Sequence, residues 1–442
     1  MIQNIFGTDG IRARIGTEFF TQQALTHIGA AIAQWAPQKL GHPPRILLGH
    51  DTRESCSFVK AALQSGLLLN GSIIYDAHII PTPTICQIVS HSNQFDLGII
   101  ISASHNPYHD NGIKLICAKS GKITFDDEHA ITQLFYQQAT QIIAYTSFGA
   151  TYYWPHAYTQ YVKTIEQWMS PQFLLGKKIV LDCAHGATHQ LAPQVFQHFG
   201  AQVLAINNQP NGININDNCG ALHLHALQEA VVAHQADIGF AFDGDGDRVI
   251  AVNKEGMIKN GDDILALLLA HQAYEHEQSI VGTIMTNQGF AVYLQQKNKK
   301  LLRTAVGDKY ISEQLIKNNM LLGGEQSGHI IMRDYMETGD GIFTALRILQ
   351  SIMQSNNWCM ETFTKFPQIL INVPISIKKD LENPFFTHLI AQHEAQLHGG
   401  RLIVRYSGTE SLLRVMVEDA DWDTAQQVGT QLSQILAQQL SA

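Results

Sequence analysis

The feature that most constrains the fold is a repeated alternation of short apolar segments with amphipathic segments of helical length. The pattern first occurs at 45–76, where Ser55 is placed as the N-cap of the helix-like stretch 55–70, and it returns at 177–207 and 278–306. Two strands that flank a helix favour parallel neighbours joined by a right-handed crossover. We therefore expect three successive α/β units of similar plan.

The C-terminal part follows a different plan. Segment 401–418 reads as two strands flanking a loop, and an amphipathic helix follows at 421–440. This order predicts a small α+β domain from about residue 366. The polar and aromatic stretches 140–157 and 358–368 are interpreted as linkers. A chain of 442 residues accommodates three domains, or four if they are small.

Charge and cysteine content exclude several classes of protein. The formal net charge is −9 and no basic run is present, so the chain lacks the Lys/Arg face that nucleic-acid binding requires. Six scattered cysteines without a C-x-x-C pair indicate reduced thiols rather than disulfides or a zinc site. The start lacks a signal-peptide pattern, and the longest apolar run, 264–270, is too short to span a membrane. We expect a soluble, cytoplasmic protein with no membrane or nucleic-acid partner.

The stretch "FDGDGDRV" places three carboxylates, Asp243, Asp245 and Asp247, directly after an apolar strand. Crowded carboxylates repel one another unless a cation neutralises them, and oxygen ligands select a hard ion such as Mg²⁺. An EF-hand loop would need glycine at its sixth position and glutamate at its twelfth, where this chain has Arg248 and Lys254. The alternative is a solvated acidic turn, which the preceding strand disfavours.

The stretch "ISASHNPYHDNGIKL" follows the predicted strand 97–101 with two hydroxyls, Ser102 and Ser104. A hydroxyl at a strand end can be a nucleophile or carry a phosphate, and a phosphoserine would supply an oxygen that the Mg²⁺ site lacks. Taken alone, the two serines could also close the strand as a hydroxyl-capped turn. The residues do not decide between the serines. Lys114 could contact the reacting hydroxyl or the phosphate.

Three other motifs could contact a sugar or a phosphate. "GGEQSGH" offers polar side chains on a glycine-rich loop, "RYSGTE" combines a glycine turn with hydroxyls and an arginine, and "FGTDGIR" adds an arginine. An ordinary loop is the alternative for "GGEQSGH", and a plain hairpin with an exposed arginine is the alternative for "RYSGTE". Asp51 and Arg53 are interpreted as a structural pair. Glu325 and Ser327 are candidates for sugar hydroxyls, His329 for polar or proton-transfer work, and Arg12, Arg405, Ser407, Gly408 and Thr409 for phosphate.

These motifs occur in an order and at spacings that resemble the α-D-phosphohexomutase superfamily over essentially the whole chain, and within it most resemble the bacterial phosphoglucosamine mutases. The resemblance implies an α/β fold of three related domains with mixed sheets around a central cleft, plus a C-terminal α+β domain. The implied domains carry the phosphoserine, metal-binding, sugar-binding and phosphate-binding loops in turn, at 1–140, 155–252, 256–362 and 368–442.

The resemblance also implies roles for the candidate residues. Ser104 would be the phosphorylated residue, with Ser102 in support, and its phosphate would bind one Mg²⁺ together with the three aspartates. Arg248 would stabilise the transferred phosphoryl group, while Lys114 and His105, and less directly His329, would serve the proton transfers. The residues implied in catalysis are Ser104, His105, Lys114, Arg12 and Arg248. Those implied in sugar binding are Glu325, Ser327 and His329, and those in phosphate binding are Arg405, Ser407, Gly408 and Thr409.

The implied reaction converts glucosamine 6-phosphate to glucosamine 1-phosphate through a 1,6-bisphosphate, which also keeps Ser104 phosphorylated, and supplies UDP-N-acetylglucosamine synthesis. A phosphomannomutase/phosphoglucomutase, a Mg²⁺-dependent sugar phosphatase and a non-catalytic sugar-phosphate binder are the alternatives. The chain departs from the family pattern at Ala13, Lys309, Ser411 and His185. Of these, Lys309 bears on substrate preference, because lysine lacks the bidentate geometry of arginine. The chain is expected to be a monomer or a homodimer.

Overall fold

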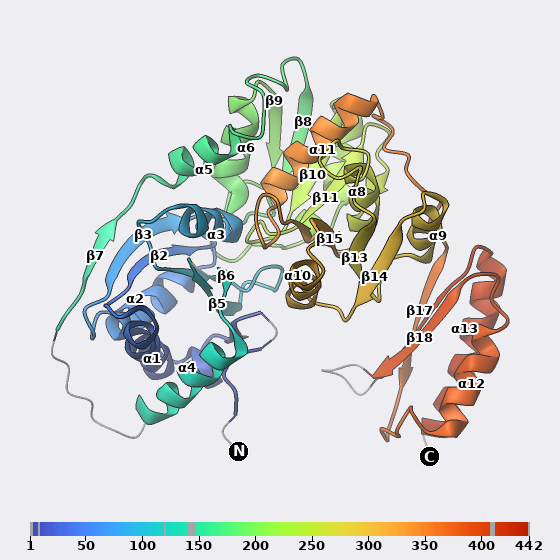
Figure 1. The fold of residues 1–442 in the computed structure, drawn as a ribbon, viewed down its shortest axis with the longest axis horizontal. Helices are drawn as coiled ribbons and strands as arrows, with labels where there is room; N and C mark the ends of the chain where they lie inside the picture. The colour runs from blue at the N-terminus through green and yellow to red at the C-terminus, as the bar shows by residue number, and fades with distance from the viewer. Residues whose placement is uncertain (1–2, 8, 119–120, 139–146, 407–411, 441–442) are drawn as a thin grey trace. The chain divides into compact units, whose positions relative to one another are not determined.

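The computed structural model describes residues 3–7, 9–118, 121–138, 147–406 and 412–440 (Figure 1). The chain forms two compact units. The first comprises Met1–His276 with Thr304–Met360, and the second comprises Glu277–Arg303 with Glu361–Ala442. Among the helices in these described ranges, none has both the length and the apolarity required to cross a bilayer.

The first sheet of unit 1 has the strand order β1-β5-β4-β2-β3-β7, with β6 paired to β5. The strands β4, β2, β3 and β7 are parallel, whereas β1, β5 and β4 pair antiparallel, so the sheet is mixed. The bounds are β1 Ile11–Arg14, β2 Arg45–His50, β3 Ile73–Ile79, β4 Leu97–Ile101, β5 Asp110–Cys117, β6 Gly121–Lys122 and β7 Ala150–Tyr153.

Strand β7 corrects the linker predicted at 140–157. It pairs in parallel with β3 at the edge of the sheet, beyond the predicted end of the first domain at residue 140. The tyrosines of β7, Tyr152 and Tyr153, are exposed. This strand lies at the edge of the sheet and its aromatic side chains face solvent. Its sequence therefore lacks the alternation of apolar residues by which a half-buried strand is recognised.

Helices cover both faces of the first sheet (Figure 1). Ile46 and Leu48 of β2 join the core with α1 (Gln22–Leu40), α2 (Cys56–Leu67) and α4 (Phe125–Gln138). Gly49, which follows Leu48, faces α3 (Thr82–His91), where a Cβ would lie 3.0 Å from the Ile85 side chain. Ser55 precedes α2 as predicted, but its side chain makes no capping hydrogen bond.

The second sheet of unit 1 has the order β12-β11-β10-β8-β9 and is also mixed. Its strands are β8 Lys178–Asp182, β9 Gln202–Ile206, β10 Ile238–Phe242, β11 Val249–Asn253 and β12 Ile258–Lys259. The helices of this part are α5 Ala157–Ile165, α6 Thr188–His198 and α7 His225–Ala233, with a 3-10 turn at Gly220–Leu222. A second 3-10 turn, Glu18–Phe20, lies between β1 and α1 of the first sheet.

The remaining elements of unit 1 are α8 Gly261–Leu268, α10 Asp308–Lys317, β15 Leu322–Gly324, β16 Ile330–Met332 and α11 Gly341–Ser355. Strands β15 and β16 form an antiparallel pair joined by the "GEQSGH" turn. Helix α11 begins after Asp340, whose side chain accepts a hydrogen bond from the Phe343 amide.

Unit 2 contains β13 Ser279–Thr283, α9 Gln288–Gln296 and most of β14 Lys300–Thr304. It also contains an antiparallel sheet of order β17-β19-β18 with its own apolar core against α13. The elements are β17 Gln368–Pro374, α12 Pro384–Glu394, β18 Arg401–Tyr406, β19 Leu412–Glu418 and α13 Trp422–Leu440. The predicted α/β class with mixed sheets is confirmed. The exact domain boundaries stay a prediction.

Candidate active site

Strand β4 ends at Ile101, and the two serines that follow it are held in different ways. Ser102 Oγ donates a 2.5 Å hydrogen bond to Asp51 and accepts one of 2.9 Å from the Ser104 amide. Ser104 has a φ of 52°, in the left-handed region that few residues with a side chain adopt. Its hydroxyl donates to Asp243 Oδ2 at 2.6 Å. Ser102 is therefore engaged in holding the loop, while the Ser104 hydroxyl faces the aspartate cluster.

Arg53 holds the backbone of this loop through hydrogen bonds. Its side chain is fully buried and donates to Asp51 Oδ2 at 2.8 Å. The same guanidinium donates to the carbonyls of Ser104, at 2.9 Å, and Asn106, at 2.8 Å. Asn216 adds a donor to the Ser104 carbonyl at 3.0 Å. The buried ion pair thus fixes the backbone whose conformation presents the Ser104 hydroxyl.

The three aspartates predicted from the sequence do converge. Asp243, Asp245 and Asp247 follow β10, are buried, and offer ligand oxygens that all lie within 4.8 Å of one another. Glycine is required between the first two, since a Cβ on Gly244 would lie only 2.6 Å from the Ser104 carbonyl oxygen. The loop that carries the three aspartates and the serine loop therefore approach each other closely through their backbones.

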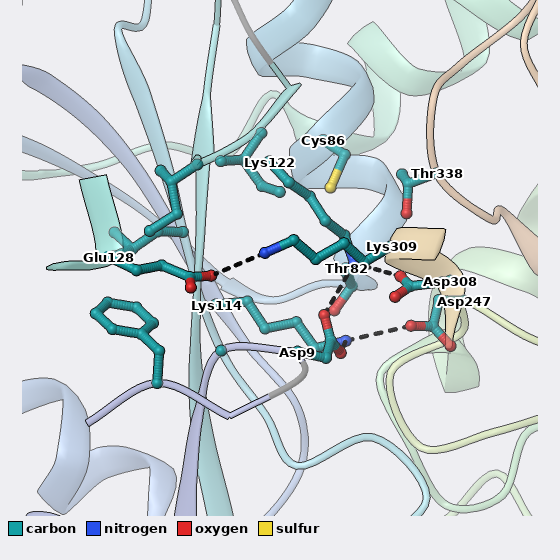
Figure 2. A pocket seen from close by; sticks show the side chains of 15 residues that line it. Asp9, Thr82, Cys86, Lys114, Lys122, Glu128, Asp247, Asp308, Lys309 and Thr338 are labelled. Carbon is teal, nitrogen blue, oxygen red and sulfur yellow. Dashed lines mark hydrogen bonds and ion pairs between the residues drawn. The ribbon is translucent and has the colours of Figure 1, made fainter. Parts of the chain in front are cut away.

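Lys114, from β5, balances part of the negative charge. Its ammonium lies 3.0 Å from Asp9, 3.0 Å from Asp245 and 3.2 Å from Asp247 (Figure 2). Burial alone would lower the pKa of Lys114, but these carboxylates raise it well above its ordinary value. Lys114 therefore stays protonated in this arrangement and stabilises charge. Thr82, the first residue of α3, donates to Asp245 at 2.6 Å.

The donor set fits a hard divalent cation. Asp245 Oδ1 and Asp247 Oδ1 are buried and have no hydrogen-bond partner in the part of the chain that the structure describes. Burial, together with the charges of Asp247 and Asp245, raises the pKa of Asp243 well above its ordinary value. A divalent cation would bind these two oxygens, which have no hydrogen-bond partner among the described residues, and would stabilise the ionised form of Asp243. The cluster is therefore capable of binding a metal.

A cavity of about 480 Å³ opens onto the Ser104 hydroxyl. Two guanidiniums line it, those of Arg12 and Arg248, and the Nε atom of each has no hydrogen-bond partner among the described residues. Two partly buried guanidiniums, each with an Nε donor that has no hydrogen-bond partner among the described residues, suit a phosphate. The predicted site residues that line the cavity are Arg12, Ser104, His105, Asp247, Arg248, Glu325 and His329.

His105 lies beside the hydroxyl, with Nδ1 at 3.5 Å from Ser104 Oγ. Burial, together with the charges of Arg248 and Arg12, lowers the pKa of His105 to about 4. The ring is therefore neutral near pH 7 and can accept a proton, which Lys114 cannot do in its observed contacts.

Several residues of the site were not singled out from the sequence. Lys122 pairs with Asp9 at 3.0 Å and also with Asp308, the first residue of α10 (Figure 2). Lys309, in contrast, was noted from the sequence as a departure from the family pattern; it lies 3.7 Å from Glu128 and lines the smaller hollow drawn in Figure 2 rather than the larger cavity. Asp9 belongs to the motif "FGTDGIR", which was read only for its arginine.

Not all predicted residues are brought to the cavity. Ser327 lies in the turn between β15 and β16 but does not line the cavity. Arg405 lies on β18 in unit 2, opposite Arg414 of β19. Ser407, Gly408 and Thr409 lie outside the described residues, so their role in phosphate binding stays a prediction.

Comparison with known families matches nearly the whole chain. The matching descriptions are those of phosphoglucomutase/phosphomannomutase. Alpha/beta/alpha domain I matches at residues 3–141, domain II at 156–256, domain III at 260–368 and the C-terminal domain at 370–434.

Curated relatives match at full length. A phosphoglucosamine mutase of Caldicellulosiruptor saccharolyticus is 39% identical, over 99% of both chains, and one of Marinobacter nauticus is 38% identical, over 98% of both. Among solved structures, a phosphoglucomutase/phosphomannomutase family protein from Burkholderia thailandensis has a TM-score of 0.78 at 22% identity, covering 99% of this chain and 98% of that one. An N-acetylphosphoglucosamine mutase of Aspergillus fumigatus, solved with GlcNAc-6P and magnesium, has a TM-score of 0.67 at 15% identity, covering 98% and 95%. At such identities the solved structures support the fold alone.

Proposed function

Since the chain belongs to the phosphoglucosamine mutase family, within the phosphohexomutases, we propose that it moves a phosphoryl group between O6 and O1 of glucosamine through a phosphate carried on Ser104. The family and the isomerase reaction predicted from the sequence are confirmed, and the relatives favour the glucosamine reaction over the phosphomannomutase alternative. The roles of the individual residues and the identity of the metal are proposals.

The contact between Ser104 and the aspartate cluster carries the proposal. The hydroxyl lies 2.6 Å from Asp243, and Ser104 lines the same cavity as Arg12 and Arg248. A phosphate on this oxygen would lie next to a cation on the aspartates and between two guanidiniums. Phosphoryl transfer rests on such positioning and charge neutralisation rather than on covalent chemistry by the protein.

Asp243, Asp245 and Asp247, together with the Ser104 phosphate, would hold one Mg²⁺. The ion would supply charge neutralisation on the transferred group. Lys114 holds Asp245 and Asp247 in place through its two hydrogen bonds. We assign Lys114 this electrostatic role rather than that of a base.

In the first half-reaction, O1 of glucosamine 6-phosphate bonds to phosphorus as the bond from phosphorus to Ser104 Oγ breaks. The proton of O1 must end on Ser104 Oγ for the step to balance. His105 is neutral and lies 3.5 Å from Oγ, so it can accept the proton from O1 and return it to the serine. Arg248 stabilises the charge on the phosphoryl group in transit.

The bisphosphate then turns in the cavity, and its 6-phosphate returns to Ser104 by the same step in reverse, which releases glucosamine 1-phosphate. In each orientation the bisphosphate also presents a second phosphate that is not transferred, and this phosphate needs a binding site of its own. We propose that Arg405 with Ser407, Gly408 and Thr409 provides it, and that Glu325, Ser327 and His329 bind the sugar hydroxyls. Glu325 already accepts from the Gly307 amide at 3.0 Å, which orients its carboxylate in the cavity wall.

The test is a coupled assay of the purified chain on the 6-phosphates of glucosamine, glucose and mannose, with and without a 1,6-bisphosphate primer. We expect glucosamine 1-phosphate to form fastest, and activity to rise when the primer loads Ser104. Release of free phosphate without any sugar 1-phosphate would instead support the Mg²⁺-dependent phosphatase. Equal rates on all three sugars would contradict the proposed preference but not the mutase reaction.

A further inference from the structure

A second group of possible metal ligands lies outside the active-site cavity. His50, Asp76 and His78 offer ligand atoms that all lie within 4.8 Å of one another. His50 is the last residue of β2, while Asp76 and His78 belong to the neighbouring strand β3, on the first sheet (Figure 1). None of the three lines the catalytic cavity or takes part in the proposed reaction.

A bulge in β3 brings the three side chains together. Leu48 pairs with Asp76, but His50, two residues further on, pairs with Ile79, three residues further on. The extra residue distorts β3, and His78 within it has a φ of 58°. A left-handed conformation is uncommon for a residue with a Cβ, and bulges re-aim side chains near functional sites. The strain therefore points to a position at which the direction of the imidazole matters.

The tautomer of His50 leaves a ligand atom facing the cluster. Its Nδ1 lies 2.7 Å from the Asp51 carbonyl oxygen, which can only accept, so Nδ1 carries the proton and Nε2 has the free electron pair. A histidine that binds a metal through one ring nitrogen usually donates a hydrogen bond from the other to a carbonyl, a carboxylate or water. His50 and Asp76 are buried, and His78 is exposed, so the cluster has one side open to solvent.

A side-chain ammonium already contacts two of the three residues. The ammonium of Lys60, from α2, lies 2.8 Å from Asp76 Oδ2 and 3.4 Å from His50 Nε2. The amine thus contacts the two buried ligand atoms that a metal would use. Because Lys60 has a flexible stem and is itself partly exposed, it can turn outward and release them.

We propose that His50, Asp76 and His78 bind one divalent d-block cation of the zinc class, in exchange for the ammonium of Lys60. Two imidazoles and one carboxylate select Zn²⁺ over Mg²⁺, which prefers oxygen ligands alone. Bonds of about 2.0–2.1 Å place tetrahedral ligand atoms about 3.4 Å apart, so modest side-chain rotation closes the cluster around the ion. Water takes the fourth position on the open side.

The test is calorimetric titration of the full chain with Zn²⁺ in saturating Mg²⁺, which keeps the aspartate cluster filled. We expect one tight equivalent per chain. His78→Asn keeps a residue that tolerates the left-handed conformation but removes the imidazole, and should weaken binding at least about tenfold. Lys60→Met removes the competing ammonium and should tighten binding. Co²⁺ should give the visible absorption of a four-coordinate site in the wild type and lose it in His78→Asn.

The matched control is His225→Ala, which removes an exposed histidine on α7 and should leave the Zn²⁺ titration unchanged. Equal affinity in the wild type and His78→Asn would overturn the proposal, because the ion would then bind elsewhere. Weaker binding in Lys60→Met would also overturn it, because the lysine would then not compete with the metal.

Discussion

The Ser104 hydroxyl donates a 2.6 Å hydrogen bond to Asp243, although 139 positions separate the two residues. Each residue lies just beyond the carboxyl end of a central strand, β4 in the first sheet and β10 in the second. Carboxyl ends of such strands are the edges at which α/β proteins bind ligands. Here two of these edges meet, so a group attached to Ser104 would lie beside the aspartate cluster that follows β10.

Ser104→Ala should abolish the mutase activity. The variant lacks the oxygen that carries the phosphate, so turnover should fall at least about a thousandfold. Intact-mass measurement should show the loss of one phosphate relative to the wild type. If the variant kept substantial activity or the phosphate, Ser104 would not be the phosphorylated residue.

Ser102→Ala is the matched control for that experiment. Ser102 holds the loop through Asp51 and the Ser104 amide, so the variant should still be phosphorylated. Leaving these buried groups without a partner should cost about 1–3 kcal/mol in the free energy of unfolding. Chemical denaturation measures this cost. If Ser102→Ala lost the phosphate and Ser104→Ala kept it, Ser102 would be the phosphorylated residue and Ser104 the supporting one.

Asp243→Asn should change stability in opposite directions with and without Mg²⁺. In the metal-free protein the substitution removes one of three crowded charges, and the raised pKa of Asp243 indicates that its ionisation is costly, so the melting temperature should rise. Mg²⁺ at a hundredfold excess over its Kd stabilises a protein by about 2.7 kcal/mol, and this gain should shrink in the variant. Thermal melts in EDTA and in Mg²⁺ measure both effects.

Glu229→Gln removes the same charge from an exposed position on α7 and provides the control. Its response to Mg²⁺ should equal that of the wild type. If Asp243→Asn kept the full Mg²⁺-dependent shift as well, the aspartate cluster would not be the magnesium site.

Arg53→Met should be among the most destabilising single changes in this loop. Asp51 would keep a fully buried charge without its partner, which costs about 3–5 kcal/mol. Asp51→Asn in the Arg53→Met background should recover part of this loss because it removes the orphaned charge. Urea denaturation of the single and double variants measures the coupling. Additive losses would show that the two side chains do not act as a pair.

The sequence predicted those parts of the site that depend on local pattern. The strand 97–101 and the aspartates that follow 238–242 were recognisable because an apolar run ending in polar residues is visible in one stretch of chain. The choice of Ser104 over Ser102 rested on resemblance alone. In the structure the two serines differ through the hydrogen bond of Ser102 to Asp51 and the left-handed φ of Ser104, and neither feature appears in the residue pattern.

The remaining parts depend on contacts between distant segments. Lys114 reaches Asp9 and Asp245 only because β5 lies between β1 and β4 in the sheet, an order that composition does not dictate. The sequence predicts a linker where β7 lies, because the side chains of β7 carry no strand pattern. Only its pairing with β3 makes it a strand. Tertiary pairing overrides local propensity in such segments.

Asp340 should make stability depend on pH in a direction opposite to that of most carboxylates. It is buried and accepts hydrogen bonds from Tyr161 and Tyr335. Burial raises the pKa of Asp340 from 3.8 to about 6, although these hydrogen bonds and that of the Phe343 amide oppose the rise. The folded state therefore binds more protons than the unfolded state between about pH 4 and pH 6, so this group's contribution to stability falls as the pH rises through that window.

Asp340→Asn removes the titration and keeps an oxygen for the Phe343 amide. The stability of the variant relative to the wild type should therefore increase from pH 4 to pH 6.5, by about 3 kcal/mol at most, and stay level above that. Asp421→Asn is the matched control, because Asp421 precedes α13, accepts from Thr424 and has a lowered pKa through those hydrogen bonds. Its variant should lose relative stability as the pH rises through the acid range. Urea denaturation at a series of pH values measures both, and parallel curves for Asp340→Asn and the wild type would show that the carboxyl is already ionised in the fold.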